Sequence, residues 1–250
     1  MYIDEIQQEI MLKTTSKIEC VYTDNTVKTA TCFFCQTNSL KIVLVTNKHV
    51  FKDCKIAKLY LTVYHQESNL YENIDLTLTL GNDILFHSFY DISTLDITNI
   101  YNVLINDGLL PQLNFITETA IITDYSMLHP LQDIVMLGYP SGIINLSTNH
   151  PITRIGVTAT SIKETYNNHE IFLTDLPTFG GSSGSPIFIT NSEGLLFLVG
   201  INSETFLQHT PVYSKPRLFQ KRKIVGYVDI PNDIGIAINS RIIKEMLANY

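Results

Sequence analysis

The chain has 250 residues, a formal net charge of −7, 45% apolar residues and 16% charged residues. This composition predicts a packed globular protein and excludes a disordered chain. The acidic balance disfavours a nucleic-acid-binding surface and no apolar stretch is long enough to span a bilayer, so we expect neither nucleic acid nor a membrane as a partner.

The first residues lack the basic segment and apolar run of a secretory signal peptide, so we expect a cytoplasmic location. Ile3, Ile6 and Ile10 recur at helical spacing. They predict a short amphipathic helix within residues 1–16.

After this helix the sequence changes to short apolar runs that polar links separate. The strands expected in the first half of the chain are residues 17–22, 27–36, 39–47, 55–66, 72–80, 84–88 and 97–104. A single helical turn is expected at 48–52 and a linker from 109 to about 123. Short strands at this spacing are typical of all-β sandwiches and barrels.

The second half repeats this pattern. Its expected strands are residues 133–138, 154–163, 171–175, 186–190, 195–203 and 235–238. Helical spacing returns in the last eleven residues, where Asn239 or Ser240 can cap a C-terminal helix.

One local cluster of basic residues departs from the acidic balance of the chain. We interpret it as a solvated loop, and its members are Lys215, Arg217, Lys221, Arg222 and Lys223.

Four cysteines lie in the first quarter of the chain. Cys32 and Cys35 have the C-x-x-C spacing of many zinc sites, and His49 and Cys54 follow them. Residues 29–36, however, have the pattern of a strand, on which positions three apart point to opposite faces. We therefore predict reduced thiols, with no metal ion and no other cofactor.

The densest cluster of small residues is the segment from Pro177 to Pro186, which lies between two apolar runs. Glycines tolerate positive φ and let neighbouring N–H groups turn the same way. A serine in such a loop can act as a nucleophile while those N–H groups receive an oxyanion. From this segment alone, a serine-rich hairpin loop is the alternative.

A nucleophilic serine needs a base within reach, and the base needs an acid that orients it. His49 follows an apolar strand that ends at Thr46, and Asp96 opens another apolar run. Asp91, a few residues earlier, is the competing acid. Taken alone, His49 has the pattern of a surface residue and Asp96 that of a residue that ends a loop.

Together these segments resemble the motifs of the trypsin-like (chymotrypsin-fold) serine proteases, in the same chain order. They are Thr46-x-x-His49-Val50, then Asp96-Ile97-Thr98-x-Ile100, then Gly181-Ser182-Ser183-Gly184-Ser185-Pro186. Segments 136–142, 199–203 and 232–238 are also similar to family segments, so the resemblance covers roughly residues 27–250. The form of the serine loop is most similar to the bacterial glutamyl endopeptidases and HtrA-like proteases.

The resemblance implies an all-β fold of two tandem six-stranded antiparallel barrels with a helix at each end. Residues 1–16 would hold the N-terminal helix. Residues 17–118 would form the first barrel, with His49 and Asp96, and residues 119–250 the second barrel, with Ser183 and the C-terminal helix.

Carried over by position, the resemblance implies that Ser183 is the nucleophile, with Ser185 a loop former. His49 would be the general base, and Asp96 would orient it. The backbone N–H groups of Gly181 and Ser183 would form the oxyanion hole.

The resemblance also implies a specificity pocket. Its base would be near Pro177 and Thr178, and its walls near Asn202, Ser203, Glu204 and Thr205. No Asp lies at the base of this pocket, so a preference for Arg or Lys is not implied. Glutamyl endopeptidases carry His at the position of Asn202, which argues against a Glu preference although Thr178 matches them. We expect a small, polar or modestly apolar residue at P1, the residue before the cleaved bond.

The function implied is that of an intracellular serine endopeptidase that cleaves protein or peptide substrates through an acyl-enzyme, as in a bacterial stress or defence system. Ser182 stands where vertebrate digestive members carry the Asp that pairs with a newly freed N-terminus. A regulatory protein partner that activates a latent enzyme is therefore expected. The alternatives are a catalytically silent, peptide-binding scaffold and a cysteine-ligated metal protein.

Overall fold

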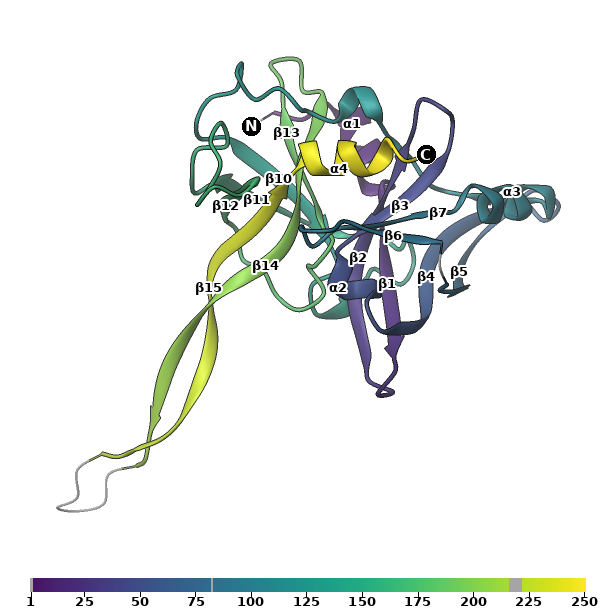
Figure 1. Cartoon of the computed structure of the whole chain (residues 1–250). Helices are drawn as coiled ribbons and strands as arrows, with labels where there is room; N and C mark the ends of the chain where they lie inside the picture. The colour runs from purple at the N-terminus through teal and green to yellow at the C-terminus, as the bar shows by residue number, and fades with distance from the viewer. Residues whose placement is uncertain (1, 82, 216–221) are drawn as a thin grey trace.

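The computed structural model describes residues 2–81, 83–215 and 222–250 and has two β-rich units packed against each other (Figure 1). We call them the first sheet, made by β1 to β9, and the second barrel, made by β10 to β15. The all-β, chymotrypsin-like fold predicted from the sequence is confirmed.

The first sheet has nine strands. They are β1 (Thr15–Tyr22), β2 (Val27–Gln36), β3 (Ile42–Thr46), β4 (Cys54–His65), β5 (Leu70–Thr79), β6 (Ile84–Phe86), β7 (Ser93–Asp96), β8 (Leu109–Pro111) and β9 (Ile116–Thr117). The main order is β5-β4-β1-β2-β3-β7-β6, with β8 on β4 and β9 on β2. The expected first barrel of six strands is therefore a larger sheet, because parts of the expected linker also pair as strands.

The second barrel is closed by six strands in the order β10-β11-β12-β15-β14-β13. They are β10 (Asp133–Gly138), β11 (Ile152–Thr158), β12 (Ile171–Asp175), β13 (Pro186–Thr190), β14 (Leu196–Tyr213) and β15 (Ile224–Asn239). Two single turns of 3₁₀ helix, η1 (Glu118–Ala120) and η2 (Pro140–Gly142), precede and follow β10.

A shared apolar core joins the two units. Phe33 and Val45 from the first sheet, Val135 and Leu198 from the second barrel, and Ile243 from the last helix are all buried in one cluster. Burial of this apolar area on both sides fixes the two units relative to each other.

Three of the helices agree with the sequence-based expectations. They are α1 (Glu5–Leu12), the single turn α2 (Lys48–Phe51) and α4 (Ser240–Leu247). Asn239 caps α4 through its side chain, which accepts a hydrogen bond from Arg241 N at 3.0 Å. Figure 1 shows α4 lying over the junction of the two units.

The expected strand at residues 97–104 is wrong, because the segment forms the helix α3 (Thr98–Asn106). Its apolar side chains Ile97, Ile100 and Leu104 pack against the first sheet at helical spacing. Asp96, which precedes the N-cap residue Ile97, accepts hydrogen bonds from Thr98 N and Thr98 Oγ1, and this local turn ends the strand before the helix begins.

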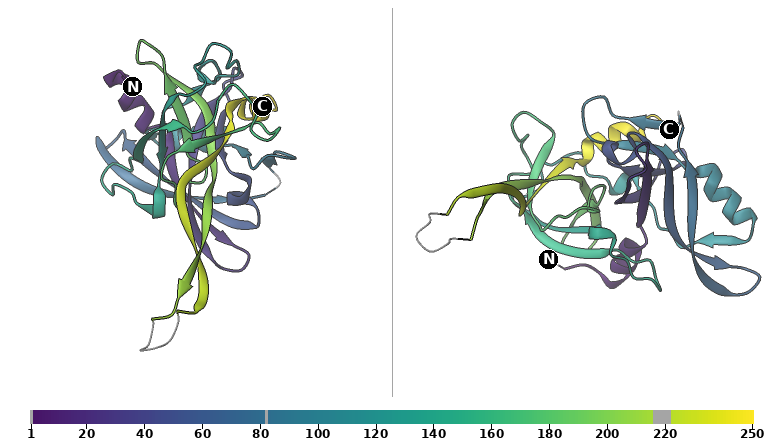
Figure 2. Two further views of the ribbon diagram at one scale, coloured as in Figure 1. Left: turned by 90° about the vertical axis from the view of Figure 1, so that its left-hand side faces the viewer. Right: turned by 90° about the horizontal axis from the view of Figure 1, so that it is seen from below.

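An arm projects from the second barrel, because β14 and β15 continue as a two-stranded ribbon beyond the expected ends of their strands (Figures 1 and 2). Their pairing runs from Gly200 with Asn239 to Tyr213 with Ile224. Lys215, Arg222 and Lys223 of the basic cluster lie past the last pair, whereas Arg217 and Lys221 lie outside the described residues.

All four cysteines are free thiols, and Cys20, Cys32 and Cys35 are buried. No group of three or more metal-ligating side chains occurs within the described ranges. Among those residues, no helix has both the length and the apolar character needed to cross a membrane.

Tyr125 offers a test of how the second barrel holds α4. Its buried hydroxyl lies 3.0 Å from Val199 O and 2.7 Å from Ser240 Oγ, and it accepts from Ser240 N at 3.0 Å. We expect Tyr125→Phe to lower the free energy of unfolding by about 1–3 kcal/mol in urea titrations, because the buried polar groups of Val199 and Ser240 lose the Tyr125 hydroxyl as their hydrogen-bond partner. The exposed control Tyr213→Phe should change it by less than about 0.5 kcal/mol, and equal losses would contradict this account.

Candidate active site

The serine loop between β12 and β13 is held by Thr31, a buried residue of β2 in the first sheet. Thr31 N donates to Ser183 O at 2.8 Å, and Thr31 Oγ1 donates to Gly181 O at 2.8 Å. From the second barrel, Asn202 N donates to Ser185 O at 2.9 Å and Asn202 Nδ2 to Ser182 O at 3.0 Å. The loop is therefore fixed from both units.

Two glycines of this loop cannot carry a side chain. Gly181 has φ +94°, and a Cβ there would lie 2.3 Å from Tyr139 O. Gly184 has φ +85°, and its Cβ would lie 2.0 Å from Thr31 O. Positive φ and close backbone approach are the two conditions that favour glycine, so both residues allow the loop to pack this tightly.

The Gly180–Gly181 peptide is oriented by Ser141 N, which donates to Gly180 O at 2.5 Å. In a trans peptide the N–H points away from the preceding carbonyl, so Gly181 N–H faces the other side, away from Ser141. Within the described residues, neither Gly181 N nor Ser183 N donates a hydrogen bond. The predicted pair of oxyanion donors is thus unoccupied by the protein's own groups.

His49 lies on α2 and is clamped by Asp91. His49 N donates to Asp91 Oδ1 at 2.9 Å, and His49 Nδ1 lies 2.7 Å from Asp91 Oδ2. Because Nδ1 faces the carboxylate, the tautomer with the proton on Nδ1 is favoured, which leaves Nε2 as the proton acceptor. The imidazole is 49% exposed, so Nε2 can reach a substrate or a nucleophile.

Asp91 is partly buried, with a side chain 24% exposed, and also accepts from Ser203 Oγ at 2.7 Å. Burial alone would raise the pKa of Asp91, but the hydrogen bonds and charge of His49 and the Ser203 hydroxyl outweigh it, so this pKa is lowered. The carboxylate therefore stays ionised beside His49.

The prediction that Asp96 orients His49 is wrong. Asp96 instead accepts hydrogen bonds from Lys41 Nζ at 3.1 Å and from Thr98. Burial alone would raise the pKa of Asp96, but these contacts outweigh it, so the pKa is lowered. The register explains the error, since β7 runs antiparallel to β3 with Ser93 opposite Thr46 and Asp96 opposite Val43. His49 follows Thr46, so the acid must come before β7, where Asp91 lies.

A chain of contacts connects His49 with the serine loop. Asp91 binds both His49 and Ser203, and Asn202, the neighbour of Ser203, binds the loop. In the part of the chain that the structure describes, no hydrogen bond links His49 to Ser183. Catalytic hydrogen bonds are often long before substrate binds. Ser183 is partly exposed whereas Ser185 is fully buried, so only the former can meet a substrate.

The predicted pocket residues separate into different roles. Thr178 and Asn202 are buried, Glu204 is exposed at the base of the arm, and the Ser203 hydroxyl is bound to Asp91. Thr178 Oγ1 and Asn202 Oδ1 have no hydrogen-bond partner among the described residues.

Thr174, which sequence reasoning missed, belongs to the same polar group. Thr174 Oγ1 is also buried without a partner in the described chain, and a Cβ at Gly235 would lie 2.5 Å from it and 3.2 Å from Asn202 Oδ1. Two unpaired oxygens therefore lie beside Gly235, and Thr178 approaches the same position with its methyl group, Cγ2, at 3.4 Å. No local pattern distinguishes Thr174 from other strand threonines.

Comparison with known proteins identifies the class. A profile described as "Trypsin-like peptidase domain" matches residues 30–201, so the chain belongs to this family. No protein with a curated description matches the sequence.

Solved structures share the fold at low sequence identity. The HtrA-type protease AlgW, solved with a tripeptide, has a TM-score of 0.53 at 15% identity over 95% of this chain, which spans 60% of that protein. A serine endoprotease from Yersinia pestis has a TM-score of 0.53 at 14% identity, and the match covers 100% of this chain and 67% of the other. The Rv3671c protease of M. tuberculosis in its active form has a TM-score of 0.50 at 12% identity, and the match covers 99% of this chain and 87% of the other.

The tight contact at Gly184 can be tested by substitution. We expect Gly184→Ala to lower the free energy of unfolding by about 2–4 kcal/mol, since it combines an unfavourable φ with overlap on Thr31 O. The control Gly180→Ala lies in the same loop, where a Cβ would meet nothing within 4 Å. Chemical denaturation that gave equal losses for the two variants would contradict this packing.

Proposed function

We propose that this trypsin-like peptidase is a serine endopeptidase that uses Ser183, His49 and Asp91. The observation that carries the proposal is the clamp of His49 by Asp91 beside a serine loop with two free N–H groups. Asp91 takes the role that the sequence assigned to Asp96. The family and fold support the class of enzyme, and the site geometry supports the assignment of roles.

The proposed reaction follows from this geometry. Ser183 Oγ attacks the carbonyl carbon of the substrate, and His49 Nε2 takes the hydroxyl proton. Negative charge that develops on the carbonyl oxygen is received by Gly181 N–H and Ser183 N–H, and one donor of this kind is worth about 3 kcal/mol. His49 then gives its proton to the leaving amine, and water hydrolyses the acyl-enzyme by the same steps.

Asp91 stabilises the protonated imidazole that forms during both steps. Its hydrogen bonds to His49 N and Ser203 hold the carboxylate in place, so the ring does not have to reorient when it becomes charged. A fixed, partly buried carboxylate acts more strongly than a solvated one.

The substrate side chain at P1 is proposed to be short, uncharged and polar. The support is the polar character of Thr178 and Asn202, whose Oγ1 and Oδ1 atoms have no partner among the described residues. A hydrogen-bond donor on the substrate would satisfy these oxygens. Neither residue carries the negative charge that would favour Arg or Lys, and the one acidic residue predicted for the pocket, Glu204, is exposed at the base of the arm.

The oxyanion loop is held by Thr31, Ser141 and Asn202, so the proposed enzyme needs no newly freed N-terminus. The cytoplasmic location and the regulatory protein partner stay predictions from the sequence. A catalytically silent scaffold is the alternative that the next two experiments separate from an enzyme.

The nucleophile is tested with Ser183→Ala. We expect this variant to lose about 10⁶-fold in kcat on a peptide substrate and to lose labelling by a fluorophosphonate. Ser185→Ala, which removes a buried hydroxyl without a partner in the described chain, should keep both. Unchanged cleavage by Ser183→Ala would overturn the assignment, and a folded wild-type protein that is neither labelled nor active would support the scaffold.

The two aspartates provide a matched pair. We expect Asp91→Asn to lower kcat by about 10⁴-fold, because the amide no longer favours the required tautomer of His49. Asp96→Asn should change kcat by less than about threefold, since Asp96 serves the start of α3. Steady-state kinetics with both variants checked for folding by circular dichroism decide this, and the reverse order of effects would restore Asp96.

A further inference from the structure

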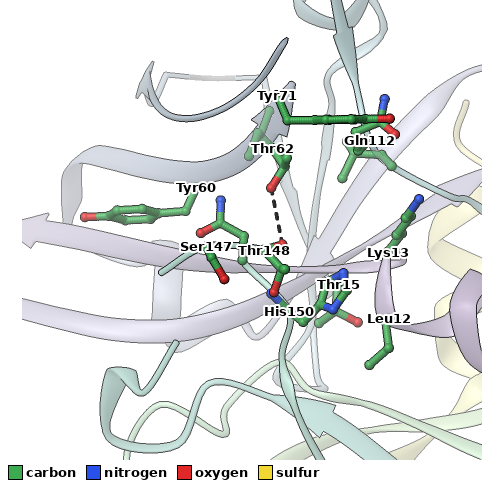
Figure 3. Close-up of a pocket in the computed structure, with 13 residues that line it drawn as sticks. Leu12, Lys13, Thr15, Tyr60, Thr62, Tyr71, Gln112, Ser147, Thr148 and His150 are labelled. Carbon is green, nitrogen blue, oxygen red and sulfur yellow. Dashed lines mark hydrogen bonds between the residues drawn. The ribbon is translucent and has the colours of Figure 1, made fainter. Parts of the chain in front are cut away.

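A pocket lies between the two units (Figure 3), and none of its lining residues belongs to the serine loop. Its volume of about 370 Å³ falls within the range of small-molecule sites. The end of α1, strands β1, β4 and β5, and the segment 147–150 of the second barrel line it. Figure 3 shows Tyr71 and Gln112 on one side and Ser147 and His150 on the other, with Thr62 Oγ1 donating a hydrogen bond to Thr148 O at 3.3 Å between the two sides.

Two basic side chains line the pocket, and Lys13 supplies its positive charge. Lys13 Nζ and the His150 imidazole line it, and within the described residues neither has a hydrogen bond or ion pair. Burial and the nearby charge of Lys13 lower the pKa of His150, which places the two basic groups in one electrostatic environment. No Asp or Glu is among the lining residues, in a chain whose net charge is −7.

The same pocket has aromatic side chains and a residue with an unpaired donor. Asn149 is a lining residue whose Nδ2 is buried without a partner in the described chain. Tyr60 and Tyr71 line the cavity with Leu12 and other apolar side chains, and Tyr71 is 67% exposed. Buried donors without partners favour a ligand that supplies acceptors, and aromatic walls favour a flat ring.

We propose that this pocket binds a small molecule that joins an aromatic ring to a phosphate or carboxylate group. The anionic group is placed beside Lys13 Nζ, and the ring lies against the exposed ring of Tyr71. Both anions share the required chemistry, namely several acceptor oxygens with negative charge.

The pocket is connected to the serine loop by one buried residue, Tyr139. Its hydroxyl lies 2.6 Å from Asn149 O and 3.3 Å from Thr15 O, both in pocket-lining residues. At its other end, Tyr139 N donates to Thr31 Oγ1 at 3.0 Å, and Tyr139 O packs on Gly181. A ligand that shifts Asn149 therefore shifts the groups that hold Gly181, and a regulatory meaning of this link rests on the proposed peptidase function.

Binding is tested on the full chain with phenyl phosphate as the probe. Inorganic phosphate supplies the charge without the ring, and benzyl alcohol the ring without the charge. We expect amide resonances of Thr15, Thr148 and Asn149 to shift saturably, with phenyl phosphate bound at least tenfold more tightly than either control probe. Equal affinity for phenyl phosphate and inorganic phosphate, or no shifts at these residues, would overturn the proposal.

Lys13→Gln should weaken phenyl phosphate binding tenfold or more. Lys163→Gln removes the same charge from an exposed position outside the pocket and should leave the affinity unchanged. Equal effects of the two variants would mean general attraction to the protein's charge and would overturn the site.

The link to the serine loop has its own readout. Saturating phenyl phosphate should shift the Gly181 amide resonance and change the rate of fluorophosphonate labelling of Ser183 in the wild type, but not in Tyr139→Phe. An unmoved Gly181 resonance overturns the link. Probe binding without any labelling contradicts the peptidase function alone, and labelling without probe binding contradicts the pocket alone.

Discussion

The site depends on the hydrogen bonds that Thr31 makes across the junction of the two units. This residue of β2 donates hydrogen bonds to the carbonyls of Gly181 and Ser183, and its hydroxyl accepts one from Tyr139 N. Its own carbonyl accepts a hydrogen bond from Thr46 Oγ1 at 2.7 Å. Thr46 ends the strand that leads to His49. One buried residue thus connects His49, the proposed base, on the first sheet with Ser183, the proposed nucleophile, on the second barrel. Buried polar groups keep such bonds because leaving them unmade is costly.

Much of this arrangement is predictable from local patterns. Most of the strands, the capped helix α4, the turn at His49 and the serine loop were expected from apolar periodicity and from small residues between apolar runs. Each depends on a few neighbouring positions, since side-chain period and turn chemistry are local properties. His49 and Ser183 were therefore assigned from segments that carry their own signals.

The remaining features depend on how distant segments pair. Asp91 and Asp96 are both aspartates next to one short strand, and only the antiparallel register of β7 on β3 decides which meets His49. Helix α3 was missed because its apolar residues also fit a strand, while Asp96, whose carboxylate forms a turn before this helix, was interpreted as catalytic. The roles of Thr31 and Thr174 have no sequence signal. Thr31 acts on a loop more than a hundred residues further along the chain, and Thr174 is distinguished only by Gly235, a glycine on another strand.

Strand β14 is a single continuous element from Leu196 to Tyr213, and it belongs both to the candidate active site and to the arm. Asn202 and Ser203, which support the serine loop and Asp91, lie where the strand leaves the barrel. At about 3.3 Å per residue, the strand extends roughly 30 Å beyond Ser203, and its pairing with β15 shifts register between Asn202 and Glu204 and between Thr205 and Leu207. The far end of the arm and the hydroxyl that binds Asp91 are thus parts of one backbone, and the register shifts beside Ser203 lie between the pairing of the barrel and the pairing of the arm.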